Sequence, residues 1–390
     1  MRISDYHFNR RQLLKAIRRA EPVARTDLVK LTGLAAGTIS QVTADFVRRG
    51  LLVEEKAAGP ALGRKRMELR INAAAGYVLC LFHRRLDFAD VEIVDLRGNR
   101  VFAHSAPLGP DHTLEQRARR LARIIDEAIA ASPFERTQIY RIGVVVHGMV
   151  DTARGLVHWL ATFEGVGVPF AALIEERVGI PVVIDNATNV IARAEHWFSE
   201  ELDVDDFGVM LVDVAVTSAY FRGGLLWSGA NGINPELGHT KIGGDDPHPC
   251  YCGATGCLAT YAAAFGIVRR ICERRGIELP LPTESEAPFR QFIAEAIGGE
   301  PVARAVFDQA GRMLGLAVAN LLNDRDPGRI VLAVFDPELP RLLEDGFRAA
   351  LKTNTLGPVY GRADIRFEVI DGDHYRKGCA ALALEDIYCS

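Results

Sequence analysis

Residues 234–257 of the chain read NPELGHTKIGGDDPHPCYCGATGC. One histidine and three cysteines fall within this stretch, although the whole chain of 390 residues has only 7 cysteines. These candidate ligands are His239, Cys250, Cys252 and Cys257. Four protein ligands close the coordination shell of a structural zinc, whereas a catalytic zinc keeps one position open for water. The spacing therefore predicts one structural Zn per chain.

Two alternatives to this ligand set stay open at the level of sequence. His248 lies between the histidine and the first cysteine and is a substitute ligand, although the neighbouring acids and prolines favour a surface histidine. One of the three cysteines could also be a plain buried thiol, which is how we interpret the remaining cysteines of the chain. Those are Cys80, Cys272, Cys379 and Cys389.

The composition is that of a globular protein, with 48% hydrophobic and 25% charged residues. A chain of this length is expected to hold two or three folding units. No apolar run reaches the roughly 18 residues of a membrane span, and residues 1–20 lack the apolar core of a signal peptide. We therefore expect a cytoplasmic protein whose cysteines are free thiols or metal ligands.

The charge is distributed unevenly along the chain. Residues 1–70 contain 15 Lys and Arg against 7 Asp and Glu, whereas the remaining residues contain 31 against 43. A basic head on an acidic body predicts that the head meets a polyanion. A solvated basic helix is the alternative, and charge alone does not separate the two.

The basic head has the pattern of a helix-turn-helix. Residues 7–20 place apolar side chains at helical spacing, and Pro22 ends that helix. A short helix follows, for which we expect Thr26 as the cap and Leu28 and Leu31 as inward residues, and Gly33 supplies the turn. A second helix carries a longer apolar stripe and ends at Gly50. Its inward residues are Ile39, Val42, Phe46 and Val47. Two short helices joined by a glycine turn are typical of DNA-binding units.

The second helix is the expected recognition helix. The outward residues near its start, which we expect to face DNA, are Thr38, Ser40, Gln41 and Thr43. The Gln41 amide can pair bidentately with adenine. Ala35 stands where Ser or Thr commonly caps such a helix. Residues 51–72 then read as two strands around a glycine-rich wing tip, whose cations are expected to meet phosphates or a minor groove. Those cations are Arg64, Lys65 and Arg66. A three-helix protein-interaction module with an incidental basic tip is the alternative interpretation.

From residue 71 onward, strands alternate with helices. Segments 75–84, 89–101, 140–151, 180–189 and 329–336 read as strands, and 207–229 reads as a hairpin. Segments 113–131, 169–179 and 303–327 read as helices. Such alternation over some 300 residues predicts two α/β lobes with a cleft between them.

The stretch quoted first resembles the signature of the ROK family of repressors, open reading frames and sugar kinases. That pattern is Glu-x-Gly-His followed by Cys-x-Cys-Gly-x-x-Gly-Cys, and here it begins at Glu236 and ends at Cys257. The likeness extends over nearly the whole body, including residues 148–157, 179–198 and 229–239. With a winged helix at the front, the chain resembles the sugar-responsive repressors of the family.

The sequence departs from the family's kinases where phosphate chemistry takes place. The resemblance places the first phosphate loop on residues 83–87, the second on 213–218 and the third on Ala333 and Val334, and none of these contains a glycine. Asp213 in the second loop would repel a phosphate. The position of the catalytic aspartate is Ala187, which has no proton acceptor. We therefore expect no kinase activity.

The resemblance also indicates which residues face a sugar. Asn186, Glu236 and His239 match the family's sugar-binding positions, and His239 would bind the metal as well. Two further positions, carboxylates in the family, are Ala187 and Ala259 here. The effector is therefore expected to differ from a simple hexose, for example as a sugar phosphate, unless the site no longer binds a ligand.

Together these patterns predict a winged helix-turn-helix followed by a two-lobed, actin-like α/β body with a structural zinc site. The DNA-binding domain is assigned to residues 1–70 and the ROK domain to 71–390, with lobe 1 at about 71–187 plus the C-terminal helix and lobe 2 at about 188–370. The expected function is a transcriptional repressor, a homodimer or dimer of dimers, that binds operator DNA under control of a sugar effector. A ligand-independent DNA-binding protein with a vestigial cleft and a residual sugar kinase are the alternatives.

Overall fold

The structure is a computed structural model that describes residues 3–56, 66–85, 88–160, 163–199, 205–243, 247–280 and 285–389. Its N-terminal unit packs three helices against a small antiparallel sheet with strand order β1-β3-β2. The helices are α1 (Ile3–Ala20), α2 (Arg25–Thr32) and α3 (Ala36–Arg48), and the strands are β1 (Val23–Ala24), β2 (Leu52–Lys56) and β3 (Met67–Ile71). Gly33, at a φ of 68°, turns the chain between α2 and α3, as its sequence position predicts.

The apolar faces of this unit follow the helical period. Leu13, Leu14 and Ile17 of α1 are fully buried, and so are Ile39 and Phe46 of α3. Together with Leu28 they form the core of the unit. These side chains are buried as the sequence pattern predicts.

Two expectations for α2 are wrong. Leu31 does not face inward, because its side chain is 59% exposed and Val29 packs against the core in its place. Thr26 does not cap the helix either. The N-cap residue is Ala24, and the Thr26 hydroxyl accepts a hydrogen bond from Arg66 instead.

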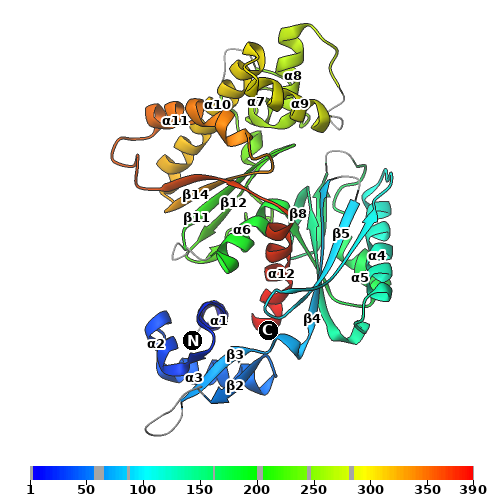
Figure 1. The fold of residues 1–390 in the computed structure, drawn as a ribbon, viewed down its shortest axis with the longest axis vertical. Coiled ribbons are helices and arrows are strands. Elements are labelled where there is room, and N and C mark those ends of the chain that lie inside the picture. Colours follow the sequence, from blue (N-terminus) through cyan, green and yellow to red (C-terminus); the bar gives the residue numbers. More distant parts are fainter. Residues whose placement is uncertain are drawn as a thin grey trace.

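The first lobe is built on a mixed sheet with strand order β10-β7-β4-β5-β6. The strands are β4 (Tyr77–Arg85), β5 (Phe88–Asp95), β6 (Arg100–Pro107), β7 (Ile139–Val146) and β10 (Val182–Asn186). Helices α4 (Leu114–Ala131) and α5 (Phe170–Val178) cover one face, as Figure 1 shows at the right. A small hairpin of β8 (Met149–Asp151) and β9 (Leu156–Trp159) extends from this lobe.

The second lobe repeats the plan with the order β13-β12-β11-β14-β15. Its strands are β11 (Phe207–Val212), β12 (Val216–Arg222), β13 (Leu225–Leu226), β14 (Arg329–Val334) and β15 (Asp364–Val369). The helices that pack on it are α7 (Ala259–Ala262), α8 (Ala264–Arg275), α9 (Glu286–Ile297), α10 (Pro301–Arg325) and α11 (Leu339–Asn354). No helix that the structure describes is long and apolar enough to cross a membrane.

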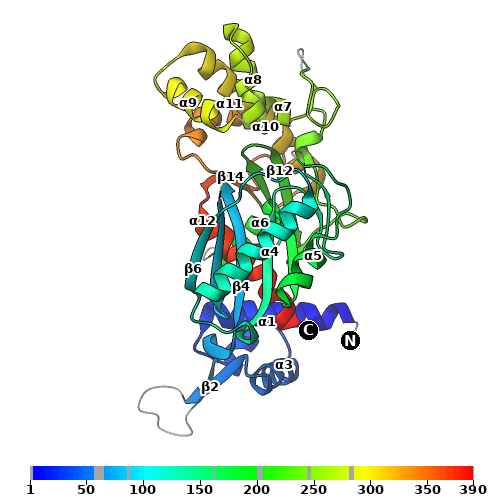
Figure 2. The ribbon, with the colours of Figure 1, turned by 90° about the vertical axis from the view of Figure 1, so that its right-hand side faces the viewer.

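Two helices lie between the sheets, as Figures 1 and 2 show from two sides. They are α6 (Ala187–Phe198) and α12 (Gly372–Cys389). Gly378 lets these helices touch, because a Cβ at that position would lie 1.8 Å from the carbonyl oxygen of Val190. The apolar core around α6 and α12 is continuous with the core of the N-terminal unit. Residues 187–189 belong to α6, so their assignment to a strand is wrong, because the chain turns into a helix directly after Asn186.

The N-terminal unit is fastened to the body by polar contacts of α1 and α3. Arg11 forms an ion pair of 3.0 Å with Glu385 of α12, and Lys15 lies 3.4 Å from the His196 ring of α6. Arg49 donates a hydrogen bond of 2.6 Å to the carbonyl oxygen of Ile387. Both inter-sheet helices therefore reach the N-terminal unit.

An ionic cluster at the junction of β15 and α12 predicts a pH dependence of stability. The His374 ring contacts the carboxylates of Glu368 and Asp371 at 3.4 and 2.9 Å, and these contacts raise its pKa. Because the folded pKa is raised, the stabilisation is complete below the ordinary histidine pKa and is lost as the pH rises through the folded value. We expect His374→Gln to lower the free energy of unfolding by about 0.5–1 kcal/mol at pH 5.5 and by much less at pH 8.5. Urea unfolding at both values tests this, with His112→Gln, at an exposed position, as the control. An equal loss at both pH values would contradict it.

Candidate ligand and metal site

The four predicted metal ligands lie together in the second lobe. Their ligand atoms are all within 4.8 Å of one another. The sulfur atoms of Cys252 and Cys257 are 3.7 Å apart, and Nδ1 of His239 lies 3.6 Å from the sulfur of Cys250. A tetrahedral zinc with Zn–S bonds of about 2.3 Å and Zn–N bonds of about 2.0–2.1 Å requires ligand–ligand distances of roughly 3.5–3.8 Å. The donor set and its spacing therefore fit zinc, and none of the three cysteines of the cluster forms a disulfide.

A tight loop brings these ligands together. Cys250 donates its N–H to the carbonyl oxygen of Ala254 at 2.7 Å, and isolated bridges pair residues 249 with 255 and 241 with 257. Gly253 and Gly256 have φ angles of 86° and 72°, which favour glycine. These two glycines of the Cys-x-Cys-Gly-x-x-Gly-Cys pattern therefore have a backbone role, because their turns bring the loop back to Cys257.

A lysine accompanies the cluster, and the sequence pattern had not indicated it. Nζ of Lys241 lies 2.8 Å from the sulfur of Cys257 and 3.0 Å from the carbonyl oxygen of His239. Burial and the charge of this lysine lower the pKa of His239. The imidazole is therefore neutral at pH 7, the form that binds metals. The ammonium group would offset the negative charge that thiolate ligands carry when a metal is bound.

The residues predicted to bind sugar lie where the two lobes meet. The Asn186 side chain caps α6 by accepting the N–H of Thr188 at 2.8 Å and donates to the carbonyl oxygen of Gly148 at 2.6 Å. One turn further on, Asn189 donates to Asn234 at 2.7 Å, which brings the segment containing Glu236 beside α6. We call this region the lobe junction.

Glu236 has the properties of a ligand acceptor. It is half-buried, and no described residue donates a hydrogen bond to its carboxylate. Burial raises its pKa. A sugar hydroxyl would supply the missing donor.

An aromatic row crosses the lobe junction, and sequence reasoning missed it. The Trp159 ring of the first lobe stacks on the Tyr251 ring of the metal loop, with centroids 5.8 Å apart and planes at 16°. The His239 ring meets Tyr251 edge-on at 5.2 Å. Gly148 touches the same row, because a Cβ there would lie 2.6 Å from the carbonyl oxygen of Trp159. The row therefore joins the surroundings of Asn186 to the metal ligand His239.

The positions that match kinase elements are packed or irregular here. Ala187 and Ala259 are 3% and 0% exposed and belong to the apolar cores. Ala333 and Val334 lie inside β14 and are fully buried. Asp213 lies at the turn between β11 and β12, and burial raises its pKa to about 6.

Apart from Thr43, the predicted DNA-facing residues divide into three groups. Ser40 and Gln41 are exposed on α3 and Thr38 is half-buried, so these three are accessible. Arg66 forms an ion pair of 3.0 Å with Asp27. Arg64 and Lys65 lie outside the described residues. The absence of a side-chain cap at Ala35 is confirmed.

The expectation for Thr43 is wrong. Thr43 is fully buried, its hydroxyl donates to the carbonyl oxygen of Ile39 at 2.8 Å, and it accepts a hydrogen bond of 2.7 Å from Arg25. It therefore has a structural role within the N-terminal unit.

A buried ionic chain runs from the lobe junction to α1, and no sequence pattern indicated it. Asp185 is fully buried and accepts hydrogen bonds from Asn189 at 2.7 Å and from the Arg193 guanidinium at 3.3 Å. Arg193 also pairs with Glu385, which pairs in turn with Arg11. The side chain of Asn189 thus contacts both the loop before Glu236 and an ionic chain that ends on the N-terminal unit.

The fold and the Cys/His cluster define a two-lobed protein of the actin-like sugar-kinase type that carries an additional N-terminal helical unit. The sequence profile of the ROK family matches residues 90–359. The chain belongs to the ROK family, and the resemblance inferred from its sequence is confirmed.

Its full-length relatives include proteins named as regulators. The chain is 24% identical over 385 residues to the xylose repressor of Caldicellulosiruptor bescii, and the match covers 97% of this chain and 96% of the relative. It is 24% identical over 339 residues to the DNA-binding transcriptional dual regulator NagC of Escherichia coli, with 86% and 82% covered.

Solved structures show the same fold. A ROK family transcriptional regulator described as a homologue of the E. coli MLC protein superposes with a TM-score of 0.81 at 22% identity, covering 99% of this chain and 97% of its own. A ROK family glucokinase from Streptomyces griseus, in complex with glucose and AMPPNP, superposes with a TM-score of 0.63 at 22% identity and covers 79% of this chain and 98% of its own.

Proposed function

We propose that this protein is a DNA-binding transcriptional regulator, a repressor whose affinity for its operator responds to a sugar or sugar derivative. Residues 1–70 act as a winged helix-turn-helix and residues 71–390 as the effector-sensing ROK domain. The observation that carries the proposal is a basic N-terminal unit with an accessible polar face on α3, joined to a ROK domain in a chain whose relatives over nearly its whole length include a named repressor.

The geometry of the N-terminal unit supports DNA binding. The first turns of α3 expose Ala36, Gly37, Ser40 and Gln41, a small and polar surface that fits a major groove. Arg48 is exposed near the end of the same helix. The paired strands β2 and β3 support the segment that carries Arg64 and Lys65, and Arg66 fastens this hairpin to α2. We assign the base contacts to Gln41 and Ser40 and the phosphate contacts to the hairpin.

Asn186, Glu236 and His239 are the proposed effector-binding residues at the lobe junction. Zinc held by His239, Cys250, Cys252 and Cys257 would act as a structural ion that fixes the imidazole beside Glu236. His239 uses Nδ1 toward the cluster, which leaves Nε2 for a sugar hydroxyl. Effector binding would bias the arrangement of the lobes and so the placement of the N-terminal unit.

We propose that the protein lacks kinase activity. Ala187 offers no base for a sugar hydroxyl, and residues 216–218 lie within β12 instead of forming a phosphate loop. As a homodimer, the protein would place two α3 helices about 34–36 Å apart on a pseudo-palindromic site.

The first test is fluorescence anisotropy on labelled DNA from upstream of the protein's own gene, titrated with sugars and sugar phosphates. We expect binding at moderate salt and a shift of about tenfold, or 1.4 kcal/mol, by one class of compound. Binding that no compound shifts would favour a vestigial effector site. ATP turnover with a sugar would favour the residual kinase, and absence of DNA binding would overturn the proposal.

The assignment of Gln41 gives a second test on the same DNA. Gln41→Ala removes a side chain that is exposed and makes no described contact, so stability is expected to remain unchanged. We expect specific affinity to fall by about 1–3 kcal/mol and discrimination at one base pair to relax. Gln291→Ala, the same change at an exposed position of α9, is the control. A loss that is equal for the control would contradict the assignment.

A further inference from the structure

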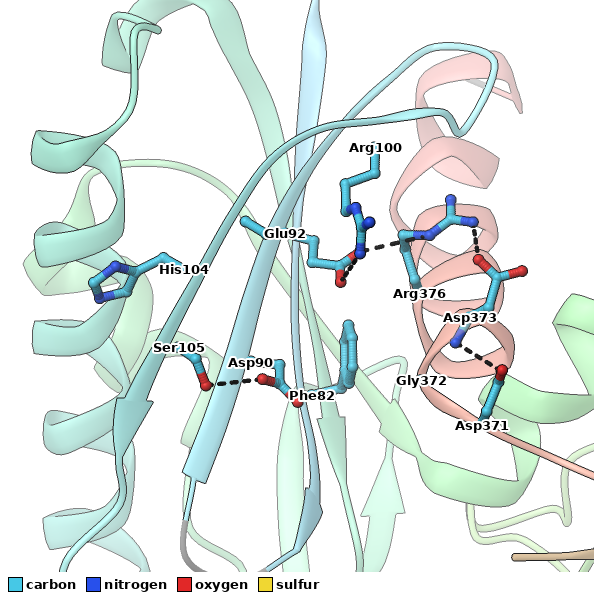
Figure 3. A pocket seen from close by; sticks show the side chains of 11 residues that line it. Phe82, Asp90, Glu92, Arg100, His104, Ser105, Asp371, Gly372, Asp373 and Arg376 are labelled. Carbon is cyan, nitrogen blue, oxygen red and sulfur yellow. Dashed lines mark hydrogen bonds and ion pairs between the residues drawn. The ribbon is translucent and has the colours of Figure 1, made fainter.

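A pocket lies beside the first turns of α12, over β5 and β6 (Figure 3). It has a volume of about 570 Å³, and it opens where α12 leaves part of β5 and β6 uncovered (Figure 3). Its lining residues are Phe82, Asp90, Glu92, Arg100, Ala103, His104, Ser105, Asp371, Gly372, Asp373 and Arg376. None of these belongs to the proposed metal or effector site. A volume of this size is that of a small-molecule site.

The lining is acidic. It contains four carboxylates and two guanidinium groups, so carboxylates outnumber cations among the lining residues, which favours a cation over an anion. From outside the lining, the His374 ring and Lys377 pair with Asp371 and Asp373. Arg100 and Arg376 both approach Glu92, at 3.3 and 3.5 Å, and Arg376 also pairs with Asp373. Across the pocket from α12, Ser105 of β6 donates a hydrogen bond of 2.9 Å to Asp90 of β5 (Figure 3).

Glu92 is left with an unused acceptor. The residue is only 9% exposed, and its atom Oε2 is buried and has no hydrogen-bond partner among the described residues. Nε of Arg376 lies 3.5 Å from this oxygen, at an ion-pair distance. A buried carboxylate oxygen without a donor is costly, and a ligand that donates a hydrogen bond would remove that cost.

We propose that this pocket is a second ligand site, which binds a small molecule bearing a primary ammonium group. The ammonium takes the place of Nε of Arg376 and donates to Oε2 of Glu92, which is buried while that guanidinium is in place. The acidic rim of Asp90 and Asp371 supplies the complementary charge. Amino sugars and aliphatic diamines share this chemistry, and both are small enough for the pocket.

The pocket is connected to the N-terminal unit through one turn of the chain, residues 95–99. Arg376 donates to the carbonyl oxygen of Gly98 from the side of the pocket. From the other side, Arg18 of α1 donates to the carbonyl oxygens of Leu96 and Arg97. A ligand that competes with Arg376 for Glu92 would therefore act on the turn that holds α1. This consequence, unlike the site itself, rests on the proposed function.

Isothermal titration calorimetry on the full chain at pH 7 tests the site without DNA. The probes are glucosamine and putrescine, with glucose as the uncharged comparison. We expect at least one ammonium probe to bind at least tenfold more tightly than glucose. Glu92→Gln is expected to weaken that binding at least tenfold, because the charged acceptor is lost. Glu176→Gln, the same change on the exposed face of α5, should leave it unchanged.

Which probe binds distinguishes an amino sugar from a polyamine as the ligand type. Asp90→Asn, on the rim, is the second variant and serves as the test if Glu92→Gln does not fold. It is expected to weaken ammonium binding by a smaller factor than Glu92→Gln. Equal binding of glucose, no binding of either ammonium probe, or unchanged binding by folded Glu92→Gln would each overturn the proposal. Loss of DNA binding with intact calorimetric binding would instead overturn only the proposed function.

Discussion

We expect Cys257→Ser to abolish stoichiometric zinc binding and to destabilise the second lobe by several kcal/mol. Cys257 is fully buried beside Cys252, and the loop of residues 249–257 closes on it. Structural zinc contributes on the order of 10 kcal/mol to the stability of small zinc domains. We expect a smaller contribution here, because the second lobe also has its own apolar core. Metal content by mass spectrometry and thermal unfolding measure the two effects.

The matched control for this variant is Cys272→Ser. Cys272 is also buried in the second lobe but lies outside the Cys/His cluster. We expect this control to keep its zinc and to lose about 1–3 kcal/mol, the range that protein mutational data give for a hydroxyl in an apolar site. Zinc retained by Cys257→Ser would show that His248 or another group completes the shell. The four-ligand assignment would then be wrong.

Arg193→Met is expected to cost about 3–5 kcal/mol, because it leaves a buried carboxylate without its cation. Asp185 is fully buried, and its remaining donors are the backbone N–H of Asn186 and the side chain of Asn189. Methionine fills the volume of the arginine stem, so the loss reports the charge and not a cavity. Urea unfolding of the variant measures the cost.

The double variant Arg193→Met and Asp185→Asn separates this effect from general damage. Removing the carboxylate as well relieves the uncompensated charge, so the double variant is expected to be more stable than Arg193→Met alone. Purely additive losses would contradict the assignment. In the same variants, the shift of DNA affinity by the effector can be measured separately from stability. A smaller shift in folded variants would show that the ionic chain from Asp185 through Glu385 to Arg11 carries the effector response.

Local patterns of the sequence predicted much of the fold and the metal cluster. Ile39, Val42 and Phe46 follow the helical period, and three cysteines within eight positions can meet in one loop. The predictions that Leu31 faces inward and Thr43 faces outward were wrong, because tertiary contacts and not the helical period decide these two orientations. The α2 helix is only eight residues long, and the packing of its neighbours decides which way its side chains face. The Thr43 hydroxyl likewise accepts a hydrogen bond from the Arg25 side chain, which lies 18 positions away in the sequence.

Contacts between distant segments could not be read from the sequence. Arg193 meets Glu385 across 192 positions, and Trp159 meets Tyr251 across the two lobes. Neither pair belongs to a spaced pattern, because its members are brought together only when the sheets and the inter-sheet helices are in place. The polar pocket beside α12 is of the same kind, since its walls come from β5, β6 and residues 371–376.

The position of α12 has a consequence for how the protein is made in the cell. A ribosome releases the chain from its N-terminus, so α1 and the strands β4 and β7 emerge long before residues 372–389. Until then the apolar face that α12 covers stays bare, and Arg11 and Arg49 lack their partners Glu385 and Ile387. The contacts that seat the N-terminal unit on the body are therefore completed only after residues 372–389 have left the ribosome.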